Sequence, residues 1–134
     1  MGGYSHLADN ASSSNNSVVL DNSESMYVYG GLNNNMNEGS KTVAHNNTVT
    51  LKNGSSAMYV FGGAGEFANG NTINIQDSTV TAAISAGVGT SGEANNTVSI
   101  SGKSVLNNAV IFGGMLHKTG NTLQMHTSGV TAGD

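Results

Sequence analysis

Apolar and polar residues recur in a fixed order along this chain, in two alternating motifs. The first motif is an Asn, a hydroxyl residue and two apolar residues at alternate positions, and it begins at Asn16, Asn47, Asn71, Asn96 and Asn121. The second is a short apolar run closed by Gly-Gly or Ala-Gly, and it ends at Gly31, Gly63, Gly87 and Gly114. Successive copies of the first motif lie 31, 24, 25 and 25 residues apart. A period of this length is typical of one supersecondary unit stacked on copies of itself.

One repeat, residues 47–70, shows what each unit predicts. Residues 48–52 alternate polar and apolar side chains, which places Val49 and Leu51 on one face of a strand. Asn53 and Gly54 predict a turn, because both residue types tolerate positive φ. Residues 58–61 predict a second strand, and the following Gly-Gly indicates a sharp bend or a close approach of two backbones.

A two-residue hairpin would use this pattern, but two or three strands in 24–25 residues favour a coil. The sequence therefore predicts an all-β parallel β-helix (β-solenoid) of about five coils of 24–31 residues, whose strands pair in parallel ~4.8 Å apart. The first strands would supply two inward columns, Val18, Val49, Ile73, Val98, Leu123 and Leu20, Leu51, Ile75, Ile100, Met125. The second strands would supply two more, Val28, Val60, Ile84, Ile111 and Met26, Met58, Ala82, Ala109. A further apolar position follows the turn at Val80, Val105 and Val130.

The repeats fill the chain, so residues 1–134 predict a single solenoid unit with coils starting near each Asn of the first motif. Gly2 and Gly3 look like the end of an earlier second motif, and residues 128–131 stop before a further Gly-Gly. We therefore expect a fragment cut from a longer repeat array; the alternative is a natural protein of 134 residues.

The composition excludes several classes of protein. Asn, Gly, Ser and Thr form about half of the chain and charged residues only 9%, which suggests disorder, but a disordered tract has no reason to keep a period. The net charge is −4, with four Lys and no Arg, so nucleic-acid binding is disfavoured. No Cys is present, and no apolar run approaches the ~20 residues of a transmembrane helix.

The Asn that opens each first motif has a structural explanation. Stacked amides ~4.8 Å apart can each bond to the next, because an Asn side chain carries two donors and an acceptor oxygen. We therefore expect a structural ladder of Asn16, Asn47, Asn71, Asn96 and Asn121.

These repeats, Asn-Asn-Thr-Val-x-(Leu/Ile) followed by Val-x-Gly-Gly and a return rich in Gly, Ala and Asn, resemble those of Gram-negative autotransporter (type V secretion) passenger regions. The resemblance runs from Gly2 to Val130 and implies a right-handed β-helix. It also implies an extracellular location, on the bacterial outer-membrane surface, with display by a C-terminal barrel. Residues 33–38, Asn-Asn-Asn-Met-Asn-Glu, depart from the pattern and lengthen one coil.

Catalytic β-helix proteins that act on polysaccharides need clustered carboxylates on one outer face. The acidic residues here are spread over the chain, at Asp9, Asp21, Asp77, Asp134, Glu24, Glu38, Glu66 and Glu93. Asp77 takes a place comparable to Asp21 two coils earlier, but Asn53 and Gly102 interrupt that column. We therefore expect no enzyme, with a polysaccharide-active β-helix enzyme as the minor alternative.

A metal site or cofactor is not expected either. Residues 62–67, Gly-Gly-Ala-Gly-Glu-Phe, are similar to a calcium-binding nonapeptide repeat, but Phe67 stands where Asp is required. The four histidines show no ligand spacing; they are His6, His45, His117 and His126.

The second strands carry the strongest functional signal. If their inward column is Val28, Val60, Ile84 and Ile111, then a partly aromatic stripe faces outward, composed of Tyr27, Tyr29, Tyr59, Phe61 and Phe112. Exposed aromatic patches are typical of partner, glycan or self-association surfaces. The alternatives are a reversed facing of these strands or a loop that covers the stripe.

These observations predict a non-catalytic module that acts by adhesion or self-association through the outer face of the solenoid. Its expected partner is a host or neighbouring-cell protein or glycan, or another copy joined end to end or side by side. The alternative is a structural spacer or the subunit of a self-assembling filament.

Overall fold

The computed structural model describes residues 1–6, 8–106, 109–114 and 120–125. In this part of the chain every regular element is a strand. The strands are β1 (Gly3–Ser5), β2 (Ser17–Asp21), β3 (Glu24–Asn33), β4 (Val43–His45), β5 (Thr48–Lys52), β6 (Ser56–Asn69), β7 (Thr72–Gln76), β8 (Thr79–Ala94), β9 (Thr97–Ser101), β10 (Val110–Gly114) and β11 (Thr122–Met125).

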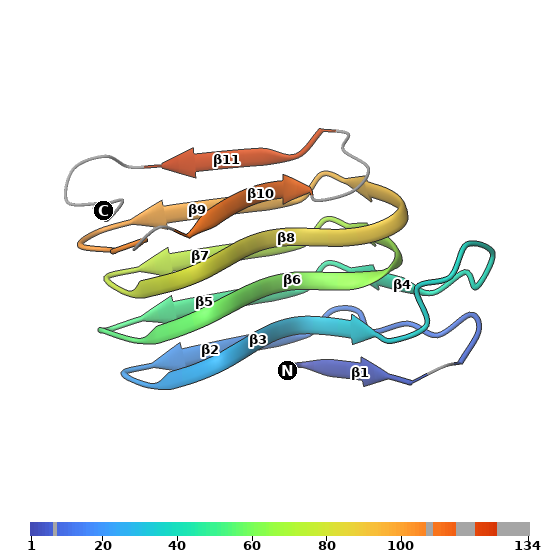
Figure 1. Cartoon of the computed structure of the whole chain (residues 1–134), viewed down its shortest axis with the longest axis horizontal. Coiled ribbons are helices and arrows are strands. Elements are labelled where there is room, and N and C mark those ends of the chain that lie inside the picture. The colour runs from blue at the N-terminus through green and yellow to red at the C-terminus, as the bar shows by residue number, and fades with distance from the viewer. Residues whose placement is uncertain (7, 107–108, 115–119, 126–134) are drawn as a thin grey trace.

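The strands form two parallel sheets that face each other (Figure 1). Sheet A has the order β1-β3-β6-β8-β10, with β4 beside the end of β6, and sheet B has the order β11-β9-β7-β5-β2. Figure 1 shows β6 and β8 curving around one side of the molecule toward the following sheet B strand. The predicted β-solenoid is confirmed, with about four turns in place of the expected five.

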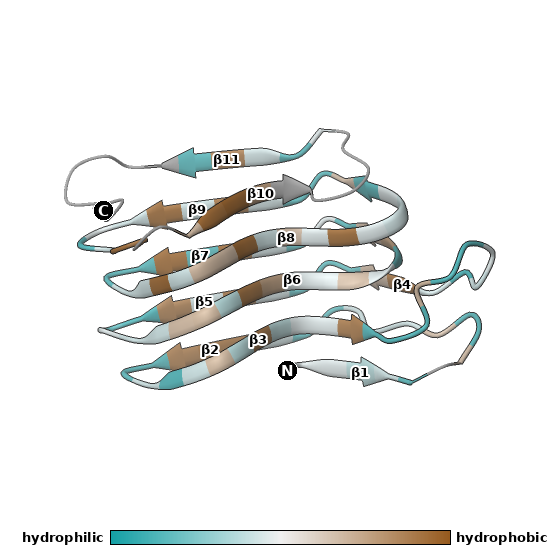
Figure 2. Ribbon diagram, in the orientation of Figure 1, coloured by the Kyte–Doolittle hydropathy of each residue, from teal (hydrophilic) through white to brown (hydrophobic). Residues whose placement is uncertain are grey.

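The strand register aligns the repeated motifs coil by coil. Thr48 pairs with Thr72, Thr72 with Thr97, and Thr97 with Thr122. In sheet A, Val28 pairs with Val60 and Val60 with Ile84. Each motif therefore lies directly above its previous copy, which is why aliphatic bands line up from coil to coil in Figure 2.

The interior is formed by three of the four predicted columns. Val49, Leu51, Ile73, Ile75, Val98 and Ile100 of sheet B and Val28, Val60 and Ile84 of sheet A are buried, and Val18, Leu20 and Ile111 pack against them while partly exposed. Leu123 is 48% exposed on β11, the last described strand of sheet B. The side chain of Met125 and residue Val130 lie outside the described residues.

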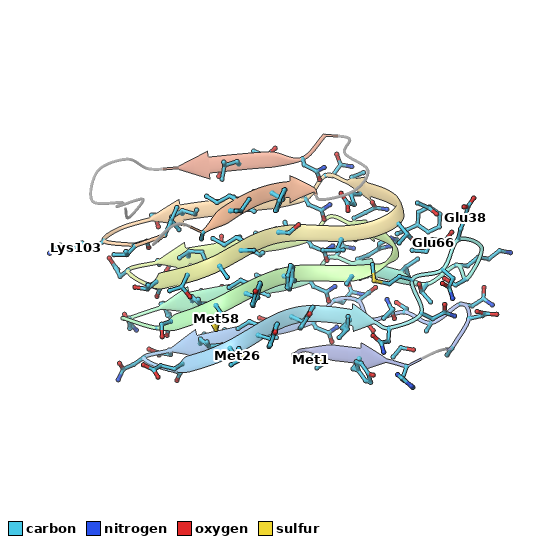
Figure 3. The ribbon with its side chains drawn as sticks, in the orientation of Figure 1. Met1, Met26, Glu38, Met58, Glu66 and Lys103 are labelled. Atoms are coloured by element: carbon cyan, nitrogen blue, oxygen red, sulfur yellow. The ribbon has the colours of Figure 1, made fainter. Side chains whose placement is uncertain are left out.

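The fourth predicted column, Met26, Met58, Ala82 and Ala109, is wrong for its two methionines. Met26 is 59% exposed and Met58 40% exposed, and both project from the outer face of sheet A (Figure 3). A register shift lies between Ala57 and Tyr59, where one residue of β6 opposes two of β8. Met58 and Tyr59 both face outward between the buried Ala57 and Val60, and β3 pairs with β6 in the same register, so Met26 and Tyr27 face outward in the same way. The inward positions are taken by Ala57, Val80 and Leu106. Ala82 and Ala109 are half-buried.

The Asn residues of the first motif form a continuous ladder at the edge of this interior. The backbone N–H and the side-chain Nδ2 of Asn47 both donate to Oδ1 of Asn71, each at 3.0 Å. The same pair of bonds joins Asn16 to Asn47, Asn71 to Asn96 and Asn96 to Asn121. The second Nδ2 hydrogen of Asn71 reaches the carbonyl of Ala44 at 2.8 Å. Asn47, Asn71 and Asn96 are fully buried and hydrogen-bonded on every polar side-chain atom.

The Gly-Gly of the second motif makes room for this ladder. A Cβ on Gly63 would lie 2.8 Å from Nδ2 of Asn71 and 2.9 Å from the Cβ of Ala44. A Cβ on Gly31 would lie 2.7 Å from Nδ2 of Asn47. Real Cβ atoms essentially never approach this closely. The Asn of the first motif can therefore pack in this position only because the second motif has Gly there.

A positive-φ corner precedes each ladder residue. It is occupied by Asn15, Asn46, Gly70, Asn95 and Gly120, with φ between 57° and 69°. Asn and Gly are the residues that adopt this conformation at least cost. The Asn-Asn doublets therefore combine two roles, since the first Asn turns the backbone and the second bonds to the next coil.

Candidate interaction surface

The outer face of sheet A carries the aromatic residues singled out from the sequence. Val28 and Val60 are buried, so the residues on either side of them face outward. Tyr27 is 53% exposed, and Tyr29, Tyr59, Phe61 and Phe112 are half-buried.

Four of the five rings form one cluster across β3 and β6. Tyr27 stacks on Tyr59 with ring centroids 5.0 Å apart and planes inclined by 8°. Tyr29 stacks on Phe61 at 5.1 Å and 26°. Burial raises the pKa of the Tyr29 phenol above its ordinary value, and the neighbouring Tyr27 adds to the shift when it ionises. The cluster is therefore packed within itself, with ring faces largely turned toward one another.

Phe112 is separated from this cluster by a row of small side chains. Tyr59 pairs with Ala83 of β8, and Phe61 pairs with Ser85. On the next coil Ala83 pairs with Val110, and Ser85 with Phe112. Ser85 has an aromatic residue beside it on each neighbouring strand, and its side chain is fully buried and donates to the carbonyl of Gly87. The predicted stripe is therefore divided into three parts: the aromatic cluster on β3 and β6, a row of small side chains on β8, and Val110 with Phe112 on β10.

A hollow lies at each end of the aromatic cluster. One, of about 380 Å³, is lined by Glu24, Ser25, Met26, Ser56, Ala57, Met58 and Thr81. The other is a groove of about 270 Å³, lined by Tyr29, Leu32, Asn34, Met36, Phe61, Ala64 and Val88. No charged side chain lines the second groove, whereas Glu24 lies at the first.

The outer wall of the second groove includes Asn34 and Met36, which belong to the loop of residues 34–42 between β3 and β4 that contains most of the insertion. Glu66 is buried, and its carboxylate accepts from the backbone N–H of Gly39 at 2.6 Å and of Lys41 at 2.8 Å. The Ser91 hydroxyl donates to the same carboxylate at 2.7 Å. Figure 3 shows Glu66 beside this loop, near Glu38.

These hydrogen bonds set the ionisation of Glu66. The bond from the Gly39 N–H is the largest cause of a pKa below the ordinary value, followed by the bond from Ser91; burial opposes them, and Lys41 contributes through its N–H and its charge. The Thr90 hydroxyl also donates to the carbonyl of Met36, two coils away in the stack. The loop is thus fixed to the two following coils, and Met36 is held against the aromatic cluster.

The outer face of sheet B is different in kind. Its outward positions are Ser17, Val19, Asp21, Thr48, Thr50, Lys52, Thr72, Asn74, Gln76, Thr97, Ser99, Ser101, Thr122 and Gln124. Hydroxyl and amide groups predominate, and the described residues place no aromatic ring on this face. Apolar surface is therefore concentrated on sheet A.

The acidic and histidine side chains do not converge. Over the described ranges no group of three or more His, Asp and Glu residues could hold a metal ion. Glu93 is buried and accepts from the N–H of Gly89, and Asp77 accepts from the N–H of Lys103. His6 contacts the Tyr4 hydroxyl, and His45 contacts the Asn69 amide. Asp134, His117 and His126 lie outside the described residues.

The hydrogen bonds that tie Glu66 to the loop and to Ser91 are not predicted by the sequence. A coil of 31 residues and a carboxylate within a Gly-rich segment are visible in the sequence, but by themselves they indicate only an insertion and a similarity to a calcium motif. In the structure the Glu66 carboxylate is used to accept N–H and O–H groups of the loop and of the next coil.

Comparison of the chain with protein-family models, with curated proteins and with solved structures found no match. No helix long and apolar enough to cross a membrane occurs in the described part of the chain.

Proposed function

We propose that this chain is a non-catalytic, surface-displayed binding module that adheres to a partner, or to copies of itself, through the outer face of sheet A. One observation carries the proposal. Four of the eight large apolar side chains that are exposed among the described residues project from this face, namely Met26, Tyr27, Met58 and Val110, whereas sheet B carries two, Val19 and Leu123. Large apolar groups gathered on one face are typical of interaction sites.

The arrangement of the rings favours a protein partner over a glycan. Sugars bind aromatic side chains mainly through an exposed ring face. Here Tyr27 covers one face of Tyr59, and Tyr29 covers one face of Phe61. Methionine side chains and the groove beside Met36 border these stacked rings, and such a surface suits apolar side chains of another protein.

The resemblance of the repeats to autotransporter passengers supports display outside the cell, on a bacterial outer-membrane surface. A rigid stack serves this purpose because the interior, the ladder and the corners repeat in every coil and leave outward side chains free to vary.

The proposal is tested with beads that carry the purified chain at fixed density. Attachment of these beads to one another and to cells lacking the chain is counted for the wild type, for Met58→Ser with Tyr59→Ser on sheet A, and for Thr50→Ser with Asn74→Ser on sheet B. We expect attachment to fall at least severalfold for the sheet A pair and to stay at the wild-type level for the sheet B pair. Equal attachment by all three proteins, or turnover of a polysaccharide by the purified chain, would contradict the proposal.

A second candidate is the subunit of a filament, and the unpaired edges of the two sheets favour it. Among the described strands, β2 and β11 in sheet B and β1 and β10 in sheet A each have a neighbour on one side only. Unpaired parallel edges are templates for another chain. Sedimentation over a range of concentrations would show species that grow without limit, and Ser17→Lys with Val19→Lys on β2 would suppress them. If growth were limited to a dimer, this candidate would be excluded.

A further inference from the structure

We infer that Met26 and Met58, together with Glu24, form a binding site for a soft monovalent metal ion, which in biology is Cu(I) and for which Ag(I) is a redox-inert probe. The site lies in the hollow of about 380 Å³ at one end of the aromatic cluster, and all three side chains line it. This inference goes beyond the proposed function and does not depend on it.

The strand register places the two thioethers side by side. The residues before and after Met26 pair with the residues before and after Met58, so the two methionines lie at the same level of neighbouring parallel strands. Figure 3 shows both on the outer face of sheet A. The next pair along the strands indicates the spacing of the side chains, since the rings of Tyr27 and Tyr59 lie 5.0 Å apart and are nearly parallel.

That spacing suits an ion held between two sulfur atoms. Neighbouring strands lie ~4.8 Å apart, which is about twice the ~2.3 Å metal–sulfur bond of zinc sites. A methionine side chain has three rotatable bonds, so the two sulfur atoms can adjust to one ion without a change in the backbone. Thioethers are soft ligands that suit Cu(I), whereas Ca²⁺ and Mg²⁺ prefer oxygen ligands. Zinc sites in proteins use thiolate, imidazole or carboxylate ligands instead.

Glu24 supplies the charge that a monovalent cation needs. It lies two residues before Met26 on β3, and both side chains are exposed, as expected for alternate residues on one face of a strand. Glu24 is the only charged residue among those that line the hollow, so one carboxylate balances one positive charge. A divalent ion would find a single carboxylate here, and the described residues contain no group of three or more His, Asp and Glu that could hold it elsewhere.

The fold does not require methionine at these two positions. Met26 is 59% exposed and Met58 40% exposed, although methionine is among the residues most often buried. On β8 the corresponding place is taken by Thr81 and Ala82, and Thr81 adds a hydroxyl to the hollow. The sequence does not reveal the site, because its pattern places both methionines in an inward column.

The inference is tested with protein whose methionine methyl groups are isotope-labelled. Silver nitrate is titrated in chloride-free buffer while the methyl NMR signals are followed separately, and zinc and calcium salts are titrated in the same way. The variants are Met26→Leu, Met58→Leu, both together, and Glu24→Gln, since leucine keeps the apolar volume without the sulfur. Met36→Leu is the matched control, because Met36 is the only methionine that lines the other groove. Circular dichroism establishes that each variant is folded.

We expect the signals of Met26 and Met58 to shift and saturate together, at a lower Ag(I) concentration than the signal of Met36. Either single leucine variant should raise the concentration that saturates the remaining methionine by about tenfold or more, because the second ligand acts at high effective concentration. Glu24→Gln should raise it severalfold, and Met36→Leu should leave it unchanged. In anaerobic competition with bicinchoninate, the wild type should retain one Cu(I) more than the variant that lacks both Met26 and Met58.

Three results would overturn the inference: Ag(I) binding at Met26 and Met58 no tighter than at Met36, single variants that leave the other methionine unaffected, or zinc shifts equal to those of silver. The first two would mean that each exposed thioether binds ions singly, as free methionine does. None of these results bears on the proposed function, because attachment of the beads is measured without added metal.

Discussion

The outer faces of sheets A and B differ in chemistry, although both sheets close over the same interior. Sheet A presents rings, methionines and small side chains, and an anchored loop extends it at one end. Sheet B presents mainly Thr, Ser, Asn and Gln from strands of uniform length. The inward columns of the two sheets are nevertheless equally aliphatic. The fold therefore constrains alternate positions only, and a function can be built on one outer face without disturbing the interior.

The sharpest contrast between inside and outside on sheet B is between two Asn residues three positions apart. Asn71→Ala would leave the N–H and Nδ2 of Asn47 without their acceptor and the carbonyl of Ala44 without its donor. With about 1–3 kcal/mol for each buried group left unsatisfied, we expect a loss of about 3–5 kcal/mol in the free energy of unfolding. Asn74→Ala, on the outer face, should cost about 0.5 kcal/mol or less. Denaturant unfolding of both variants measures the difference, and equal losses would show that the ladder does not support the stack.

Two glycines on sheet A give the corresponding contrast, between a contact with the buried Asn ladder and a contact with a ring edge. Gly63→Ala adds a Cβ that meets both Asn71 and Ala44, neither of which has room to move, so we expect a loss of about 2–3 kcal/mol. Gly92→Ala meets only the ring edge of Phe67, at 3.1 Å, and should cost less. Thermal unfolding of the two variants tests this order, and the reverse order would show that the ladder yields to the added methyl.

The loop that extends sheet A should respond to acid while the sheets do not. The pKa of Glu66 is lowered in the folded protein, so its contribution to stability is present above the ordinary glutamate value of about 4.3 and is lost as the pH falls through the lower folded value. Glu66→Gln should be less stable than the wild type at pH 7, and the difference should shrink toward pH 3. Amide exchange at Gly39 and Lys41 reports the loop directly. Glu24→Gln, with an exposed carboxyl, is the control. If the stability difference between the wild type and Glu66→Gln did not change with pH, the hydrogen bonds from the loop to the ionised Glu66 carboxylate would be contradicted.

The smallest expected effect is the coupling free energy between neighbouring side chains on each outer face. A double-mutant cycle on Tyr27 and Tyr59, with Ala at each, should give a coupling free energy of about 0.5–1.5 kcal/mol, since the rings stack at 5.0 Å. The same cycle on Thr48 and Thr72 of sheet B should give less, toward the lower end of the ~0.2–1 kcal/mol range of cross-strand pairs. Comparable couplings would mean that ring stacking adds nothing to the sheet A surface.

The sequence predicted the parts of the fold that depend on repetition. Val49, Leu51 and Val60 alternate with polar or aromatic neighbours at the same place in each repeat, and this identifies both the strand and the face. The stacking of Asn47 on Asn71 follows from the same alignment.

Features that occur once could not be derived in this way. Met58 and Tyr59 both face outward between the buried Ala57 and Val60, and nothing in the local pattern distinguishes this break from regular alternation. The position of residues 34–42 depends on Glu66 and Ser91, which lie in later coils, so no local signal connects them. The burial of Ser85 is likewise not predicted by the local pattern, which places it at an outward position beside Phe61 and Phe112 of the neighbouring coils.

The amide ladder also determines how this architecture can change in length. Every step joins an Asn to an Asn by the same two donors and one acceptor, whichever coils are involved. If residues 71–95 were duplicated in tandem, Asn71 would donate to its own copy and the copy to Asn96, and each bond would find an identical partner. A rod of this kind can grow or shorten by whole repeats, and the step of 31 residues from Asn16 to Asn47 shows that a loop between two ladder residues can lengthen without breaking the ladder.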